Sequence, residues 1–229
     1  MSRALRALSS AYVERRERIA DGAALSGRGK RAAFALFYGP LHYLLVSHIV
    51  QSLPRAIDHQ RTLVDLGCGT GASGAAWGSS FAARPFVLGL DRNAWALGEA
   101  AMTYQSFGLA ARTRKGNLAT TRLPNERAAL LAAFTLNEMP DGVRDAMLGQ
   151  LMARVQQGDT LLIVEPLAGN AARWWKRWER EIESAGGRAD QWRVRAELPP
   201  IIVKLDRAAG LDHREITGRS LWCPASAGR

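Results

Sequence analysis

The glycine-rich stretch VDLGCGTGASG at residues 64–74 constrains the fold more than any other part of the sequence. It follows TLVDLG at 62–67, an apolar run typical of a buried strand, and it opens a helical stretch at 72–80. Glycines let the backbone turn sharply and approach a ligand closely. We therefore expect a strand, a tight turn and a helix, with a ligand lying against the turn.

Two ligand-binding patterns fit these glycines. One is G-x-G-x-x-G beginning at Gly69, the dinucleotide fingerprint, with Asp91 about 20 residues further on. The other is D-x-G-x-G-x-G, formed by Asp65, Gly67, Gly69 and Gly71. An acid directly before the turn would repel a pyrophosphate but would suit a ligand carrying a sulfonium and an amino group. The second pattern fits better, and a dinucleotide-dependent dehydrogenase stays open as an alternative.

Further apolar runs alternate with helical stretches along the chain. Expected strands cover 62–67, 85–91, 112–118, 129–137 and 159–166, and expected helices cover 72–80, 93–106 and 141–156. Continuous apolar strands separated by helices predict an α/β fold with a mostly parallel sheet and helices on both faces.

The remaining segments surround this core pattern. Residues 1–57 read as an N-terminal helical cap, interrupted at Gly39 and Pro40, and residues 58–229 form the main domain. A helical insert is expected at about 169–198 and a helix at 199–211, with Pro near its first turn. Residues 213–224 supply a last strand or a tight pair, and His213 within them carries no pattern of its own.

The stretch 64–74 resembles motif I of the class I S-adenosylmethionine (AdoMet)-dependent methyltransferases. Asp91, at the end of VLGLD, matches that family's second-strand acid, which holds the ribose hydroxyls, and LDRNAWAL resembles the usual continuation. The resemblance implies a Rossmann-like sheet and AdoMet as cofactor. Asn117 is a candidate near the adenine amino group, although a turn role is as plausible. The cofactor-binding residues implied are Asp65, Gly67, Gly69, Gly71, Asp91, Arg92, Asn117 and Asn137.

The stretch FTLNEMP at 134–140 ends the fourth expected strand on an amide and a carboxylate. In open α/β sheets the carboxyl ends of the strands line the ligand crevice. We hypothesise that Asn137 hydrogen-bonds the substrate and that Glu138 positions or deprotonates the attacking atom. Alternatively, Glu138 caps the helix beginning at Asp141 and Asn137 contacts AdoMet only.

FTLNEMP also resembles the H-T-L-N-E-L motif of a methyltransferase-like family linked to small-ribosomal-subunit assembly. FYGPLHYLLVSHIV and VEP at 164–166 resemble further parts of that family. Phe134 stands where the family often has His, and the family's cysteine cluster is missing, so no metal is expected. The resemblance implies an association with ribosomal RNA, and it leaves a non-catalytic AdoMet-binding assembly factor as an alternative to an enzyme.

Three tryptophans, Trp174, Trp175 and Trp178, lie among arginines in the expected insert. They could stack on bases of single-stranded RNA, pack the insert against the core, or line a lid over a small-molecule pocket. Tyr38 and His42 could also face the substrate, because the N-terminal helices of the resembled family close over the active site.

The net charge and the lengths of the apolar runs indicate which classes of partner and which location to expect. A formal net charge of +10 favours an anionic partner such as RNA, although an arginine-rich composition alone would give the same charge. We expect no membrane span, because no apolar run approaches the roughly 18–20 residues needed, and no secretory signal, so the expected location is the cytoplasm. The sequence thus predicts a methyltransferase whose acceptor, whether RNA, a ribosome-associated protein or a small molecule, is unidentified.

Overall fold

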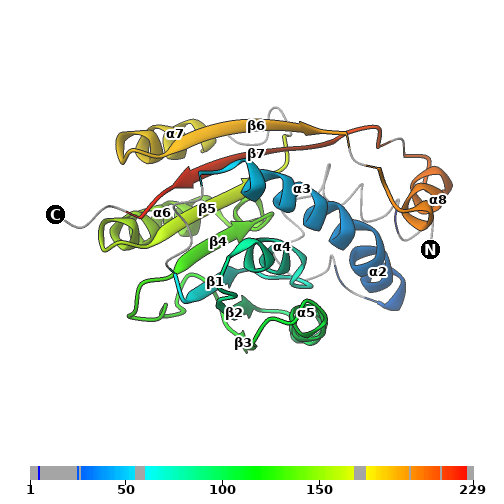
Figure 1. The fold of residues 1–229 in the computed structure, drawn as a ribbon, viewed down its shortest axis with the longest axis horizontal. Coiled ribbons are helices and arrows are strands. Elements are labelled where there is room, and N and C mark those ends of the chain that lie inside the picture. Colours follow the sequence, from blue (N-terminus) through cyan, green and yellow to red (C-terminus); the bar gives the residue numbers. More distant parts are fainter. Residues whose placement is uncertain are drawn as a thin grey trace.

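The computed structural model describes residues 5, 25, 27–54, 60–167, 174–195, 197–211 and 213–225. Its centre is one seven-stranded sheet with the order β3-β2-β1-β4-β5-β7-β6, which runs from bottom to top in Figure 1. Strands β1 to β5 are parallel, whereas β7 is antiparallel to both of its neighbours. The strands are β1 (Thr62–Leu66), β2 (Phe86–Asp91), β3 (Ala111–Lys115), β4 (Ala129–Ala133), β5 (Thr160–Glu165), β6 (Arg188–Val194) and β7 (Ile216–Cys223).

Helices cover both faces of the sheet, as the alternating pattern predicts. One buried cluster joins one face to α3 (Gly39–Ser52), α4 (Ala72–Ser80) and α5 (Ala94–Ser106). A second cluster joins the other face to α6 (Asp141–Gln156) and α7 (Trp175–Ser184). The expected α/β class and mostly parallel sheet are therefore confirmed.

The N-terminal helices run without a break from Arg28 to Ser52. The helix α2 (Arg28–Ala33) continues through a π-helical segment, η3 (Phe34–Tyr38), into α3. The expected interruption at Gly39 and Pro40 is wrong, because the wider π turn closes on the Gly39 amide just before Pro40, whose ring lacks an N–H. The rest of the expected cap lies mostly outside the described residues.

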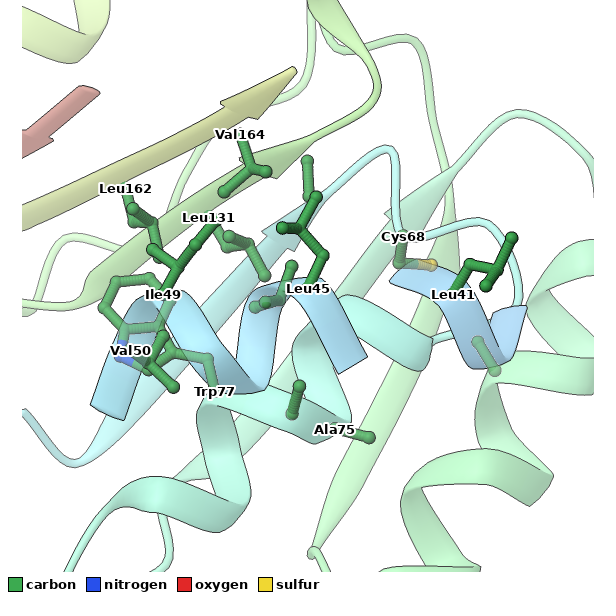
Figure 2. Packing of buried hydrophobic residues seen from close by; sticks show 14 of the residues in the cluster. Leu41, Leu45, Ile49, Val50, Cys68, Ala75, Trp77, Leu131, Leu162 and Val164 are labelled. Carbon is green, nitrogen blue, oxygen red and sulfur yellow. The ribbon is translucent and has the colours of Figure 1, made fainter. Parts of the chain in front are cut away.

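This continuous helix packs against the sheet and shares a buried cluster with it. Figure 2 shows Leu45 and Ile49 of α3 beside Leu131, Leu162 and Val164 of the sheet. At 25 residues it is long and apolar enough to cross a membrane by length and composition alone, so the expectation that no run reaches that length is wrong. Half of its most apolar window is buried here, which is also typical of a core helix.

Two expected strands are shorter than the apolar runs suggested. The strand β4 ends at Ala133, because Phe134 has a φ of 58°, which no strand residue adopts, and Leu136–Glu138 then forms a 3-10 turn, η4. The strand β3 ends at Lys115, where a turn around Asn117 begins.

The expected helical insert is only partly helical. Its helix α7 is followed by strand β6, which forms an edge of the sheet and pairs with β7 along its whole length. The insert reads as helical because it begins with charged helix formers, yet its second half alternates around Trp192 and Val194. The expected helix at 199–211 is present as α8 (Pro200–Ala208), and the last expected strand is β7.

Candidate active site

A cavity of about 700 Å³ opens at the carboxyl ends of the parallel strands. Its walls come from the loops after β1, β2, β3, β4 and β5, from the residues before β7 and from the helix η3–α3. This edge is where open α/β sheets bind their ligands. Of the residues expected to bind cofactor or substrate, those that line it are Tyr38, His42, Asp65, Gly67, Gly69, Asp91, Arg92, Asn117, Asn137 and Glu138.

The glycine turn after β1 is fixed by backbone bonds and by a neighbouring threonine. The amides of Gly67 and Cys68 donate to the Leu90 carbonyl oxygen at 2.8 and 2.9 Å. Gly67 has a φ of 71°, and a Cβ there would overlap the Thr135 side chain. Because the Thr135 hydroxyl lies 3.2 Å from the Gly67 carbonyl oxygen, the loop after β4 holds the turn in place. At Gly67 the backbone itself therefore lines the cavity.

Gly71 does not line the cavity, in contrast to the other motif glycines. It precedes α4 in a left-handed conformation with a φ of 80°. A Cβ there would lie 2.9 Å from the Cα of Ala100 in α5. Gly71 therefore allows α4 and α5 to pack closely, and it supports the turn without facing a ligand.

Asp91 ends β2 with its carboxylate held by two backbone amides. Its Oδ2 accepts from Gly69 at 3.0 Å, and its Oδ1 accepts from Asn93 at 2.8 Å. Asn93 in turn caps α5 by accepting from the Trp95 amide at 3.0 Å. The glycine turn and the start of α5 thus orient one carboxylate at the cavity, and each of its oxygens keeps a further lone pair for a hydroxyl donor.

Asp65 is buried beneath the turn. The Tyr104 hydroxyl donates to its Oδ2 at 2.8 Å, and burial raises the pKa of Asp65 to about 7. Tyr104, on α5, was not expected from the sequence, because no local pattern relates it to Asp65. A cation entering the cavity would favour the ionised form of this acid.

Asn117 makes the turn that was expected as one of its two roles. Its Oδ1 accepts from the Ala119 amide at 3.0 Å, and its carbonyl oxygen accepts from the Thr121 amide at 2.9 Å. The same residue lines the cavity, so a contact with a ligand remains compatible with the turn.

Glu165, at the end of β5, organises the segment after β4. Its Oε1 accepts from the amides of Leu136 at 2.8 Å and Asn137 at 3.3 Å, and its Oε2 accepts from the Asn137 side chain at 2.6 Å. The Trp174 indole N–H donates to the Asn137 Oδ1 at 3.2 Å. The sequence placed Glu165 in the strand end VEP but did not reveal that it orients Asn137.

Glu138 is half-buried and lines the cavity. Burial raises its pKa to about 8, and the nearby Arg92 opposes that shift, whereas Glu165 and Asp91 add to it. The capping alternative is wrong, because α6 begins after Pro140 and no side chain caps it. Glu138 therefore belongs to the cavity and to the electrostatic surroundings of Arg92 and Asp91.

Aromatic rings form a further part of the cavity wall, and one of them, Phe34, lies beside Gly69 of the glycine turn. The ring of Phe134 stacks on His42, with centroids 3.7 Å apart and planes 13° from parallel. Phe34 and Tyr38 each lie 6.2 Å from the same imidazole. Burial lowers the pKa of His42 to about 3, so this ring is neutral at physiological pH. The left-handed backbone of Phe134 is rare for a bulky residue and places its ring in this stack.

Trp174 and Trp175 do not line the cavity, so their expected substrate contact is wrong. Both are buried, and Trp178 is fully buried beside them. The guanidinium of Arg219 lies 4.1 Å from the Trp175 ring centroid, within the core. A platform for base stacking needs exposed ring faces, so these tryptophans pack the insert against the sheet.

The residues at the glycine end of the cavity fit AdoMet. Gly67 and Gly69 present bare backbone, Asp91 presents a carboxylate suited to two ribose hydroxyls, and Asp65 provides a buried acid near the turn. A cavity of about 700 Å³ is within the range for a cofactor together with a small second ligand. The acids disfavour a pyrophosphate, which argues against a dinucleotide. Among the described residues, no group of three or more His, Cys, Asp or Glu side chains could hold a metal ion.

Comparison with known proteins gives similarity in structure only. No family model matches the chain, and no curated protein matches it significantly in sequence. A candidate O-methyltransferase from Nostoc punctiforme superposes with a TM-score of 0.61 and 14% identity, over 96% of this chain and 71% of that one. An O-methyltransferase family protein from Burkholderia thailandensis superposes with a TM-score of 0.58 and 17% identity, over 91% of this chain.

A third structure was solved with ligands. It is an O-methyltransferase from neocarzinostatin biosynthesis in complex with S-adenosylmethionine and 2-hydroxy-5-methyl naphthoic acid, with a TM-score of 0.51 and 16% identity over 80% of this chain. This chain spans 63% of the Burkholderia protein and 56% of the neocarzinostatin enzyme. These likenesses do not support the expected relation to the ribosome-assembly family. What they do establish is that the chain has the Rossmann-like fold of the class I methyltransferases.

Proposed function

We propose that this protein is an AdoMet-dependent methyltransferase that transfers a methyl group to a hydroxyl oxygen of a small, largely apolar molecule. The observation that carries the proposal is a single cavity with two unlike ends. The cofactor end, defined here by Asp65, Gly67, Gly69, Asp91 and Asn117, is acidic and backbone-rich. The acceptor end is mostly apolar and aromatic, and it is lined by Tyr38, Leu41, His42, Leu45, Phe134, His213, Ile216 and Thr217.

The cofactor end suits a ligand with net positive charge. AdoMet carries a sulfonium and an ammonium against one carboxylate, and burial raises the pKa values of the three acids Asp65, Glu138 and Glu165. Ionisation of such acids becomes favourable when a cation lies beside them. In this proposal Glu138 supplies negative charge near the sulfonium, because its electrostatic neighbours, Arg92 and Asp91, belong to the cofactor end.

The acceptor end suits a flat apolar body. Its walls are mostly aromatic and aliphatic side chains, which exclude water and hold planar rings well. A planar aromatic acceptor is also supported by one of the similar structures, an O-methyltransferase that was solved with a substituted naphthoic acid. We therefore assign the acceptor to hydroxylated aromatic or similarly planar compounds.

When bound, AdoMet would supply an activated methyl group on its sulfonium. The residues of this chain then need to align an oxygen with that methyl group and exclude water. Asn137 is suited to orientation, because Glu165 and Trp174 fix its carboxamide and one N–H and one lone pair remain for a ligand. The helix η3–α3 forms the wall that shields the acceptor from solvent.

The test is methyl transfer from radiolabelled AdoMet into separate fractions of small molecules, protein and total RNA, beginning with a panel of phenols and naphthols. The proposal predicts label in the small-molecule fraction as an alkali-stable methyl ether. Saturable AdoMet binding without transfer to any fraction would instead indicate a non-catalytic AdoMet-binding protein.

One observation favours RNA as a second class of methyl acceptor. The exposed edge strand β3 carries Arg112, Arg114 and Lys115, and the whole chain has a net charge of +10. Exposed cations of this kind attract phosphates, although they also protect an edge strand from aggregation. Label recovered in nucleosides after digestion of the RNA fraction would favour this acceptor over the small molecule.

A further inference from the structure

We propose that His213 is the general base of the reaction and that Asp206 is its positioning residue. This inference rests on the proposed methyltransferase function and adds to it a proton acceptor and a restriction on the substrate. Asp206 lies on α8 and His213 follows that helix, so both belong to a part of the chain remote from the glycine motif.

The two side chains form a fixed pair. The Nδ1 of His213 lies 2.5 Å from the Oδ1 of Asp206, and the backbone amide of His213 donates to the Oδ2 of Asp206 at 2.8 Å. Both carboxylate oxygens therefore bind the same residue, and the carboxylate itself is buried. A carboxylate bound at Nδ1 holds the proton on that nitrogen and leaves the lone pair on Nε2.

The imidazole is directed at the acceptor end. His213 lines the cavity and keeps 33% of its side-chain surface accessible. The ring of Phe37 packs edge-on against it at 5.6 Å between centroids, which restricts its rotation. Within the described part of the chain, the hydrogen bonds of His213 are made by its Nδ1 and its backbone amide, and its Nε2 makes none. A buried acid, an oriented imidazole and an open cavity together have the arrangement of a base with its orienting group.

The sheet topology explains why His213 reaches this cavity. The strand β7 runs antiparallel to β5, and Arg219 pairs with Glu165 at the carboxyl end of β5. The residues before Arg219 continue past that end, so Ile216 and Thr217 line the cavity together with His213. The dyad consequently lies beyond β5, whereas Asp91 lies at the end of β2, three positions away in the sheet.

Other titratable groups line the same cavity but are less suited to the task. His42 is stacked on Phe134, and its pKa is lowered to about 3, which makes it a weak base. Glu138 has Arg92 and Asp91 as electrostatic neighbours, at the cofactor end. Glu215 is paired with Arg195 at 3.2 Å. The remaining titratable residues on the lining are Tyr38, Asp65, Cys68, Asp91, Arg92 and Glu165.

The assignment restricts the acceptor to a hydroxyl that still holds its proton at neutral pH, such as a phenol or an alcohol. The Nε2 of His213 removes the hydroxyl proton while the oxygen lone pair forms the new bond to the methyl carbon. The bond from that carbon to sulfur breaks, and its electron pair goes to sulfur. The imidazolium is stabilised by Asp206 and returns the proton to water after the product leaves.

The first experiment compares the variants His213→Asn, Asp206→Asn and the control His48→Asn in methyl transfer to a phenolic acceptor. His48 is exposed on α3 and does not line the cavity. General-base catalysis contributes about 10²–10⁴-fold, so we expect kcat to fall at least 100-fold in His213→Asn, with KM and AdoMet affinity within about threefold of wild type. Asp206→Asn should lower kcat about 10-fold or more, and His48→Asn should retain wild-type values.

The pH profile separates a base from a structural residue. If His213 is the base, wild-type kcat should fall toward low pH, and His213→Asn should lose this dependence. Asparagine can still donate to Asp206 from near the Nδ1 position, which favours folding of the variant. If thermal unfolding shows that His213→Asn is unfolded, Asp206→Asn and its pH profile provide the test.

A second readout needs no AdoMet. Binding of 2-naphthol to the free protein is followed by calorimetry, with 2-methoxynaphthalene as a control ligand that has no hydroxyl proton. Wild type should bind 2-naphthol more tightly than His213→Asn does, because the Nε2 lone pair accepts a hydrogen bond from the naphthol hydroxyl. Both proteins should bind 2-methoxynaphthalene equally.

The outcomes distinguish this inference from the proposed function. Absence of AdoMet binding or of methyl transfer in wild type would overturn the proposed function and, with it, the base. Normal transfer with an unchanged pH profile in a folded His213→Asn would overturn the base alone. The same holds if His42→Asn, and not His213→Asn, removes both turnover and the preference for 2-naphthol over 2-methoxynaphthalene.

Discussion

The two ends of the cavity are built in different ways. At the cofactor end, short side chains and bare backbone are held by hydrogen bonds between neighbouring loops, such as the bond from Gly69 to Asp91. At the acceptor end, large rings from separate helices and loops pack against one another, as His42 does against Phe134. The first end is rigid in its backbone and suits one ligand, whereas the second depends on side chains that can be exchanged to suit another acceptor.

The largest expected effect comes from Gly67→Ala at the cofactor end. A Cβ there meets Thr135 and requires a φ of 71°, so we expect a loss of about 2–4 kcal/mol in the free energy of unfolding and no measurable AdoMet binding. Denaturant unfolding and calorimetry measure both. The control is Gly98→Ala, at an exposed position of α5 with open space around it, which should stabilise the protein by about 0.5–1 kcal/mol. Equal behaviour of the two variants would contradict the rigid turn.

Glu165→Ala should weaken the connection between the two ends. It leaves the amides of Leu136 and Asn137 without their acceptor, at a cost of about 3 kcal/mol in the free energy of unfolding. Because Asn137 also loses its orientation, kcat should fall more than AdoMet affinity does. Glu183→Ala, on the exposed face of α7, is the control and should change stability by less than about 0.5 kcal/mol. A variant with wild-type stability and turnover would show that Glu165 is not an organising residue.

His42→Ala should affect the acceptor end alone. Removal of the ring stacked on Phe134 is expected to raise the acceptor KM about 10-fold while the AdoMet dissociation constant changes less than about twofold. Because the pKa of His42 is lowered to about 3, the wild-type contribution of this ring should not vary between about pH 5 and about pH 9. Steady-state kinetics at several pH values measures both. A parallel loss of AdoMet affinity would mean that the two ends are not separable.

The smallest expected effect is a release of protons when AdoMet binds. Burial raises the pKa values of Asp65 and Glu138 to about 7 and about 8, and a cation beside them favours their ionised forms. Binding near pH 7 should therefore release on the order of one proton, measured by calorimetry in buffers of different ionisation enthalpy. Glu138→Gln should release fewer. Proton uptake instead of release would contradict the cationic ligand.

The same acids make the stability of the protein without AdoMet depend on pH. The folded protein holds their protons up to about pH 7 or 8, whereas the unfolded chain loses them near the ordinary carboxyl pKa values of 3.8 and 4.5. Over that window the folded state binds more protons, so the free energy of unfolding from this source falls as the pH rises. Addition of AdoMet should reduce the fall, because the bound cation stabilises the carboxylates.

The cofactor end could be predicted from the sequence because its residues are local. The glycines follow directly on β1, and Asp91 ends the next strand, so a strand–turn–helix pattern places them without knowledge of distant contacts. Even there, Gly71 had a packing role that spacing alone does not distinguish from ligand contact. Tyr104 was missed because its partner, Asp65, lies 39 positions away.

Of the acceptor end, only Tyr38 and His42 were expected, from the family resemblance, and both line the cavity. The rest could not be predicted, because it is assembled from distant segments. Only the fold brings His42 of α3 against Phe134, and the left-handed backbone of Phe134 has no sequence signal. No sequence motif marks His213, because it reaches the cavity only through the reversed direction of β7. The tryptophans of the insert were ambiguous for a related reason. Their burial follows from β6 joining the sheet edge and α7 packing over it.

The most direct test of the two-ended cavity is calorimetric titration of AdoMet into the wild-type protein and into Asp91→Ala. The account predicts saturable one-to-one binding to wild type, and binding at least about 10-fold weaker to a folded Asp91→Ala, because the carboxylate that would accept the ribose hydroxyls is lost. In both proteins 2-naphthol should bind with the same affinity, since Asp91 lies at the cofactor end. No AdoMet binding to wild type, or equal AdoMet binding to the two proteins, would contradict the account.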